Sequence, residues 1–204
     1  MTVTVEPPSW HGAAHARNIA SAALRMTYQL RPHGAHHVGT TGPLIMVCRA
    51  ENALVGAILH ATVPRPVHVL ANEAMGKALR QGLMAKAGVI PVVLPAAVEA
   101  QRRAVAAVAD DRAVVVTGTS VPVGYLVAMT RAAVMPVVVL GAEGRVPTDP
   151  PRPRSRIDVY YADPVEVPFS GDPLRASTRA AIEEQVRQLV MDAESVAAMR
   201  AGRA

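Results

Sequence analysis

Few side chains in this sequence have the types and spacing that acid–base or nucleophilic chemistry needs. All seven histidines lie in the first third of the chain, and Cys48 is the single cysteine. His37 and His68 adjoin segments with the pattern of strands, so each is a candidate general base, although no carboxylate is spaced to orient either ring. The thiol of Cys48 could accept an acyl group from a thioester, but a cysteine inside an apolar strand is more often inert core filling.

Two further patterns could bind a metal ion or a nucleotide. His11 and His15 are one helical turn apart, but no acidic or cysteine ligand accompanies them, so we expect no metal site. "TGTSVPVG", residues 117–124, follows an apolar run and could form an anion nest from backbone amides. It lacks the Lys-Ser/Thr ending of a P-loop and the glycine spacing of a dinucleotide fingerprint. We therefore expect no cofactor.

Apolar runs alternate with amphipathic segments through most of the chain. Strands are predicted at residues 43–48, 66–71, 89–94, 112–118, 134–141 and 157–167, and helices at 51–61, 73–88, 96–110 and 124–133. This alternation predicts an α/β fold, with a largely parallel or mixed central sheet covered by helices on both faces. We expect a tail at 1–11 and one domain at 12–204, which ends in a helix at about 174–200.

The terminal helices and the loops admit alternatives. Residues 12–30 predict a helix with one apolar face, formed by Ile19, Ala23, Met26 and Leu30. We expect this face to pack on the core rather than on a membrane. Residues 31–43 and the proline- and arginine-rich residues 146–156 predict loops. The last helix carries the stripe Ile182, Val186, Leu189, Ala193 and Val196, which should dock on the domain rather than pair with a partner.

The amino-acid composition limits the classes of partner that we expect. The formal net charge is +5 and comes almost entirely from scattered arginines, while aromatic residues make up 3% of the chain, so nucleic-acid binding is not expected. An anionic membrane surface remains compatible with this charge. The sequence shows no signal peptide, no spanning segment and no cysteine pair, which together predict a cytoplasmic protein, with a peripheral position on the inner face of the plasma membrane as the alternative.

From about Arg17 to Pro168 the order of elements and several phrases resemble the glycerophospholipid acyltransferase family. "TGPLIMVCRAENALVGAIL" resembles the family's first block, in which a strand leads into N-H-x-S-x-x-D and a helix. "RPVHVLANEAMGKALRQGLMAKAGVIPV" resembles the second block, in which a strand is followed by an A-K-x-E-L type helix, a glycine and I-P-V. "AVVVTGTS" falls where the family has its third block, F-P-E-G-T-R-S, and "VGYLVAMTRAAVMPVVVLGAE" resembles the closing helix and V-P-V strand. The resemblance implies transfer of an acyl chain from acyl-CoA or acyl carrier protein to glycerol-3-phosphate or lysophosphatidate.

The residues that would perform this chemistry differ. At the family's His and Asp, the general base and the residue that orients it, this chain has Ala50 and Val55, with Arg49 at the preceding Asn. Alanine and valine cannot move a proton. Thr117 and Ser120 match the Glu and Arg that the family uses for the acceptor's phosphate.

Neighbouring positions are partly retained. Gly118 and Thr119 keep the residue types of the third block, and in the second block Asn72 replaces the usual Lys and leaves Glu73. The resemblance implies a set of ligand-binding positions at these strand ends: Arg49, Glu51, Asn52, Thr117, Gly118, Thr119 and Ser120.

Our main hypothesis is a pseudoenzyme that binds a lipid, an acyl chain or a protein partner on an acyltransferase-like scaffold. One alternative is an active acyltransferase with a relocated base, for which His68, His37 and Cys48 are the candidates. Another is a structural subunit of an active acyltransferase, and oligomerisation remains open.

Overall fold

Seven strands form one mixed sheet in the computed structural model, which describes residues 8–50, 52–71, 88–92, 97–118, 122–145 and 149–202. The strands are β1 (Gln29–His33), β2 (Leu44–Cys48), β3 (Val67–Ala71), β4 (Ile90–Pro91), β5 (Ala113–Thr117), β6 (Ala133–Leu140) and β7 (Arg156–Tyr161). Their order across the sheet is β1-β7-β6-β2-β5-β3-β4. Residues 73–87 of the helix expected at 73–88 lie outside the described residues.

The centre of the sheet is parallel. β6, β2, β5, β3 and β4 run in one direction, whereas β7 is antiparallel to β6 and β1 is parallel to β7. All five residues of β2 and all five of β5 are buried, as expected for apolar strands covered on both faces. The predicted α/β class and mixed sheet are confirmed.

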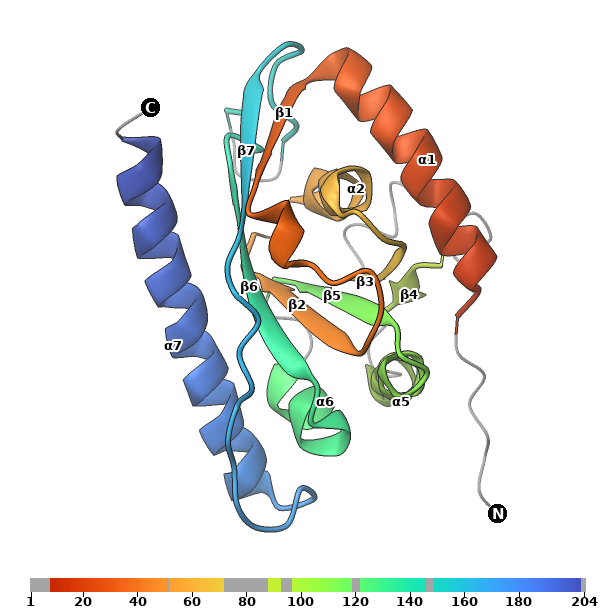
Figure 1. Ribbon diagram of the computed structural model, residues 1–204, viewed down its shortest axis with the longest axis vertical. Helices are drawn as coiled ribbons and strands as arrows, with labels where there is room; N and C mark the ends of the chain where they lie inside the picture. The colour runs from red at the N-terminus through yellow and green to blue at the C-terminus, as the bar shows by residue number, and fades with distance from the viewer. Residues whose placement is uncertain are drawn as a thin grey trace.

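Helices cover both faces of this sheet (Figure 1). On one face lie α1 (Trp10–Thr27) and α2 (Ala53–Thr62), and on the other lie α5 (Ala97–Ala109), α6 (Val123–Thr130) and α7 (Ala176–Ala201). Alternate strand residues supply the two cores: Met46 and Val115 pack with α2, while Ile45 and Val116 pack with α5 and α6. None of the described helices is both long enough and apolar enough to cross a membrane.

The first helix packs through a different face from the one its sequence suggested. Ile19 and Met26 are 58% and 88% exposed, whereas Ala13 and Leu24 are buried. The expectation of a core-facing Ile19/Met26 stripe was therefore wrong. Ala13 allows close approach to the chain at Gly88, where a Cβ would lie 2.8 Å from the Cβ of Ala13.

The second departure is β1, which occupies residues that were expected to complete the first helix and begin a loop. Tyr28 already has extended backbone angles, and residues 29–33 pair with β7. Pro32 is tolerated because β1 lies at the edge of the sheet, where one side of the strand needs no hydrogen-bond donors.

The last helix docks on the sheet, as expected. Ile182 and Val186 are 0% and 2% exposed within the α5/α6 core. Val196, the last member of the predicted stripe, is 42% exposed, and its neighbour Ala197 instead packs on Val138 and Tyr160 with 1% exposure. Figure 1 shows α7 running the length of the molecule beside β6 and β7.

Candidate functional site

The carboxyl ends of β2, β5 and β6 lie at one edge of the parallel sheet, where α2 begins. Cys48 and Thr117 are register partners, and the Gly118 amide donates a hydrogen bond to the Cys48 carbonyl at 2.9 Å. Gly118 adopts a left-handed conformation with φ 67°. The fold thus gathers the matched positions of the first and third blocks at the edge where open α/β sheets usually bind ligands.

At this edge Ala50 and Val55 contribute only apolar packing. Ala50 is half-buried against the α1/α2 core, and Val55, in the first turn of α2, has no exposed surface and belongs to that core. The methyl group of Ala50 cannot accept a proton, and the apolar core around Val55 does not support proton transfer.

Asn52 organises the same edge structurally. As N-cap of α2 it accepts a hydrogen bond from the Leu54 amide through Oδ1 at 2.8 Å, which satisfies a helix-terminal N–H. Its Nδ2 donates to the Ala142 carbonyl at 3.1 Å and to the Asp149 carbonyl at 2.8 Å. One buried amide therefore joins the start of α2 to the segment that follows β6.

Arg49 and Thr117 are also engaged in structural contacts. Nη1 of Arg49 lies 3.3 Å from Oε2 of Glu194 on α7. This half-exposed ion pair joins the residue after β2 to a helix on the face of the sheet opposite α2. Thr117 is buried, and its hydroxyl donates to the Leu70 carbonyl at 3.3 Å. The predicted binding residues Glu51, Thr119 and Ser120, and Asn72 and Glu73, lie outside the described residues.

The candidate replacement groups do not converge on Ala50. His68 is the second residue of β3, away from that strand's carboxyl end, and is fully buried with Nδ1 2.9 Å from the Gly88 carbonyl. Burial lowers the pKa of His68 despite that hydrogen bond. Burial also raises the pKa of the Cys48 thiol to about 11, so it is a thiol rather than a thiolate near neutral pH.

His37 has the carboxylate that the sequence did not reveal. Its Nδ1 lies 2.8 Å from Oδ1 of Asp163, although the two groups are not aligned as a hydrogen bond. The pair borders a small pocket of about 170 Å³ between β6, β7 and the second half of α7, lined in part by Val138, Tyr160 and Ala197. This pocket contains neither Ala50 nor Thr117.

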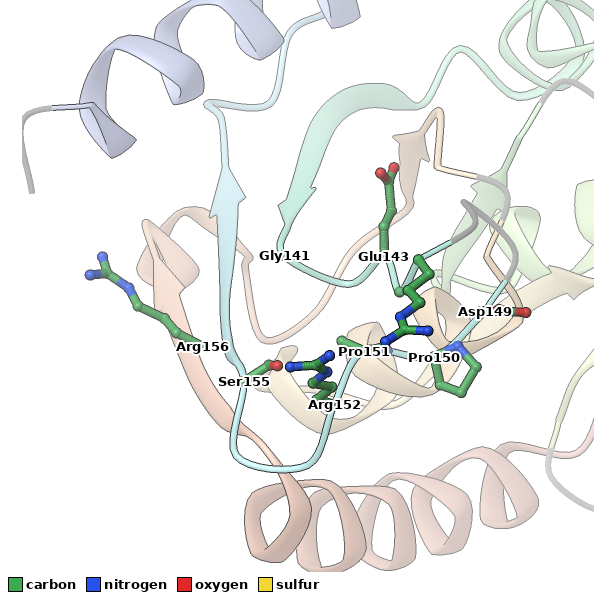
Figure 2. Close-up of a pocket in the computed structure, with 10 residues that line it drawn as sticks. Gly141, Glu143, Asp149, Pro150, Pro151, Arg152, Ser155 and Arg156 are labelled. Atoms are coloured by element: carbon green, nitrogen blue, oxygen red, sulfur yellow. The ribbon is translucent and has the colours of Figure 1, made fainter.

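A larger pocket of about 680 Å³ opens beyond the end of β6 (Figure 2). Its lining comes from residues 141–145 and 149–156 and includes three arginines, Arg145, Arg152 and Arg156. Residues 146–156 were expected to form a solvated loop. The available signal was its concentration of arginine and proline, which here line a cavity instead of only facing solvent.

The described part of the chain holds no cluster of three or more histidine, cysteine or acidic side chains placed to bind a metal ion. His11 and His15 are both exposed on α1.

Together, the sheet order, the helical layers and the strand-end edge define an acyltransferase-like α/β fold. The chain is similar to the crystal structure of the 1-acyl-sn-glycerophosphate (LPA) acyltransferase PlsC from Thermotoga maritima, with a TM-score of 0.59 and 16% sequence identity. The match covers 89% of this chain and 79% of that one. No protein-family model matches the chain, and no curated protein matches it.

Proposed function

We propose that this protein uses an acyltransferase-like scaffold for binding and does not catalyse acyl transfer. The observation that carries the proposal is the pair Ala50 and Val55, which the fold holds at the strand-end edge as packing residues. Asn52 supports it, because its side chain is committed to the α2 cap and to the segment after β6.

The ligand class that we propose is a lipid, an acyl chain or a protein partner, with cytoplasmic or peripheral membrane location. Asn52, at the strand-end edge, donates a hydrogen bond to the carbonyl of Asp149, which lines the pocket beyond β6. We therefore propose that the edge and the pocket form one binding site. No cofactor is needed for such a role.

The test is acyl transfer and thioester hydrolysis with a panel of acyl-CoA and acyl carrier protein donors, using glycerol-3-phosphate and lysophosphatidate as acceptors. We expect no turnover above that of a heat-denatured sample. Transfer by the folded protein would overturn the proposal.

A second candidate, acyl transfer with a relocated base, is favoured at one position only. His37 has the carboxylate of Asp163 at 2.8 Å and borders a pocket, and a small rotation of either side chain would be needed to align the two as an oriented base requires. If turnover is found, its loss in His37→Ala but not in His36→Ala would assign the base, whereas loss in Cys48→Ala or His68→Ala would direct attention to those buried groups.

A further inference from the structure

The small pocket between β6, β7 and the second half of α7 lies on the α7 face of the sheet, away from the strand-end edge (Figure 1). Its volume is about 170 Å³, roughly six times the ~30 Å³ that one water molecule takes up in the liquid. A cavity of this size encloses a short aliphatic group whose polar end stays at the mouth. It does not hold a long acyl chain or a nucleotide.

Part of the lining of this pocket is apolar and fixed. Val138, Tyr160 and Ala197 pack together and are 6%, 8% and 1% exposed. The Tyr160 ring stacks on His33 with the ring centroids 4.5 Å apart, and Nε2 of His33 lies 2.8 Å from Oδ1 of Asp158. These contacts hold the aromatic wall in one position before a ligand enters, which reduces the ordering cost of binding.

Two opposite charges line the same pocket from different elements. Arg200 lies in the last turn of α7, whereas Asp163 follows β7. Among the described residues, no carboxylate forms an ion pair with Arg200. Asp163 pairs only with His37 in that part of the chain, at 2.8 Å and without an aligned hydrogen bond. A cation on the helix side and an anion on the strand side are therefore both accessible to a ligand.

This pair of charges restricts the chemistry of the ligand. A carboxylate without an amine would be attracted by Arg200 and repelled by Asp163, and an amine without a carboxylate would experience the reverse. A zwitterion satisfies both charges. Its apolar remainder can then enter the cavity beside Tyr160 and Ala197, as is usual in small-molecule pockets with an apolar lining and a few polar groups.

We infer that this pocket binds a free α-amino acid with a short aliphatic side chain, of the size of leucine. The guanidinium group of Arg200 binds the α-carboxylate with paired hydrogen bonds, and the Asp163 carboxylate accepts from the α-ammonium group. The inference goes beyond the proposed function, because this pocket contains neither Ala50 nor Thr117 and the binding needs no acyl donor.

Four probes separate the parts of this recognition. Leucine carries both charges and the aliphatic group, isocaproate lacks the amine, isoamylamine lacks the carboxylate, and glycine lacks the side chain. Calorimetric titration of the folded protein measures each of them. We expect leucine to bind at least about fivefold more tightly than any of the other three, because each of those lacks one of the three contacts.

Two variants test the charges one at a time. Arg200→Gln should weaken leucine binding by about fivefold and should not weaken isoamylamine binding. Asp163→Asn should weaken leucine binding by about the same factor and should not weaken isocaproate binding. Arg102→Gln, on the exposed surface of α5, and Asp192→Asn, on the exposed surface of α7, are the matched charge controls and should stay within about twofold.

A third variant fills the cavity without changing a charge. Ala193→Leu places a larger side chain in the lining of the pocket and should abolish leucine binding. Ala198→Leu, on the exposed surface of the same helix, should retain it. Circular dichroism and urea denaturation check that each variant is folded.

The inference would be overturned by undetectable leucine binding, by leucine binding no tighter than that of glycine, or by binding that persists in both charge variants. Equal binding of leucine and isocaproate, with no effect of Asp163→Asn, would also overturn it and would assign the pocket to a simple carboxylate. Acyl-transfer measurements on the same samples keep the two proposals apart. Turnover would remove the non-catalytic function and leave arginine-dependent leucine binding standing, whereas silence in both assays would do the reverse.

Discussion

At residue 55 the fold buries a valine with no exposed surface, where the resemblance would place an aspartate. Ala50, by contrast, is only half-buried at the end of β2. The fold should therefore tolerate a substitution at position 50 better than one at position 55. Restoring the family's His and Asp is a structural problem as much as a chemical one.

The double variant Ala50→His with Val55→Asp should be poorly stable and inactive. An unpaired carboxylate inside the α1/α2 core should lower the free energy of unfolding by about 3 kcal/mol or more, measured by urea denaturation. Ala50→His alone should cost less, because that position is only half-buried. A double variant as stable as the parent would show that the α2 start can rearrange around an acid.

Cys48 should resist alkylation in the native protein. Its pKa is raised to about 11, mainly by burial, so little thiolate exists at pH 8 and access to the sulfur is blocked. Mass spectrometry after iodoacetamide treatment should show an unmodified native chain and full labelling in urea. Rapid native labelling would return Cys48 to the set of candidate nucleophiles.

Among the connections between elements, the Asn52 side chain joins α2 to the segment after β6. It accepts a hydrogen bond at the start of α2 and donates to the segment after β6, and one substitution can remove the donated bonds alone. Asn52→Asp keeps an oxygen to cap the Leu54 amide but loses the donor to the Ala142 and Asp149 carbonyls. We expect faster amide exchange in residues 141–145 and 149–156, with α2 less affected.

Asn52→Ala is the companion variant, because it also removes the cap. Loss of the cap should cost about 1 kcal/mol, the usual worth of an N-cap, whereas the aspartate variant keeps the cap but places a buried carboxylate beside two carbonyl oxygens. Equal exchange in both variants and in the parent would mean that the Asn52 amide does not hold the segment.

The contact between α6 and α7 depends on Gly124. A Cβ there would lie 2.3 Å from the Arg179 carbonyl oxygen, and the Gly124 amide donates to Oε2 of Glu183 at 2.5 Å. Gly124→Ala should separate the helices and cost about 1–3 kcal/mol in urea denaturation. Gly202→Ala, where the nearest atom would be 3.5 Å away, is the control and should be nearly neutral.

Apolar runs and their spacing were sufficient to predict most of these elements. Fully buried strands such as β2 and β5 lack alternation and are bounded by Gly or Pro, so their positions follow from local composition. β1 could not be found in this way, because its strand character comes from pairing with β7, which is distant in the sequence. The exposed face of α1 was missed because alanine and leucine positions, not Ile19 and Met26, meet the core.

The candidate site likewise has one part that the sequence predicts and one part that it does not. Its strand-end edge could be predicted, since local motifs place Ala50, Val55 and Thr117 at the ends of strands. The pocket that includes Arg145 and Arg152 could not, because it depends on the folding of residues after β6 against α1 and Asn52. Long-range contacts of that kind leave only a compositional trace in the sequence.

At the scale of the whole molecule, two buried histidines link stability to pH. His60 is 5% exposed and neither ring nitrogen has a hydrogen-bond partner among the described residues. Burial, followed by the nearby His68, lowers the pKa of His60 to about 4. Burial, with Arg112 as a smaller cause, also lowers the pKa of His68.

The protein should therefore lose stability as the pH falls. Both histidines are neutral in the folded and unfolded states above their ordinary pKa of about 6.5, so the full stability is present there. Between about pH 6.5 and 4 the unfolded chain binds protons that folded His60 does not, which favours unfolding by about 1.4 kcal/mol per pH unit for that residue.

Urea midpoints measured from pH 7 to pH 4 test this. His60→Leu should flatten the decline, whereas His15→Gln, an exposed histidine on α1, should leave its slope unchanged. An identical slope in His60→Leu and the parent would assign the acid sensitivity to His68 or to carboxylates instead.

The pairing of β1 with β7 has a consequence for synthesis on the ribosome. Residues 29–33 meet their partner strand at residues 156–160, so β1 emerges long before that strand exists. β2, β3, β5 and β6 can pair among themselves in the meantime, because each finds a neighbour from within residues 44–140. Loop-closure entropy favours this order as well. We expect the parallel centre to form first, and the beginning of the chain to be fastened to the sheet only when its last strand has been made.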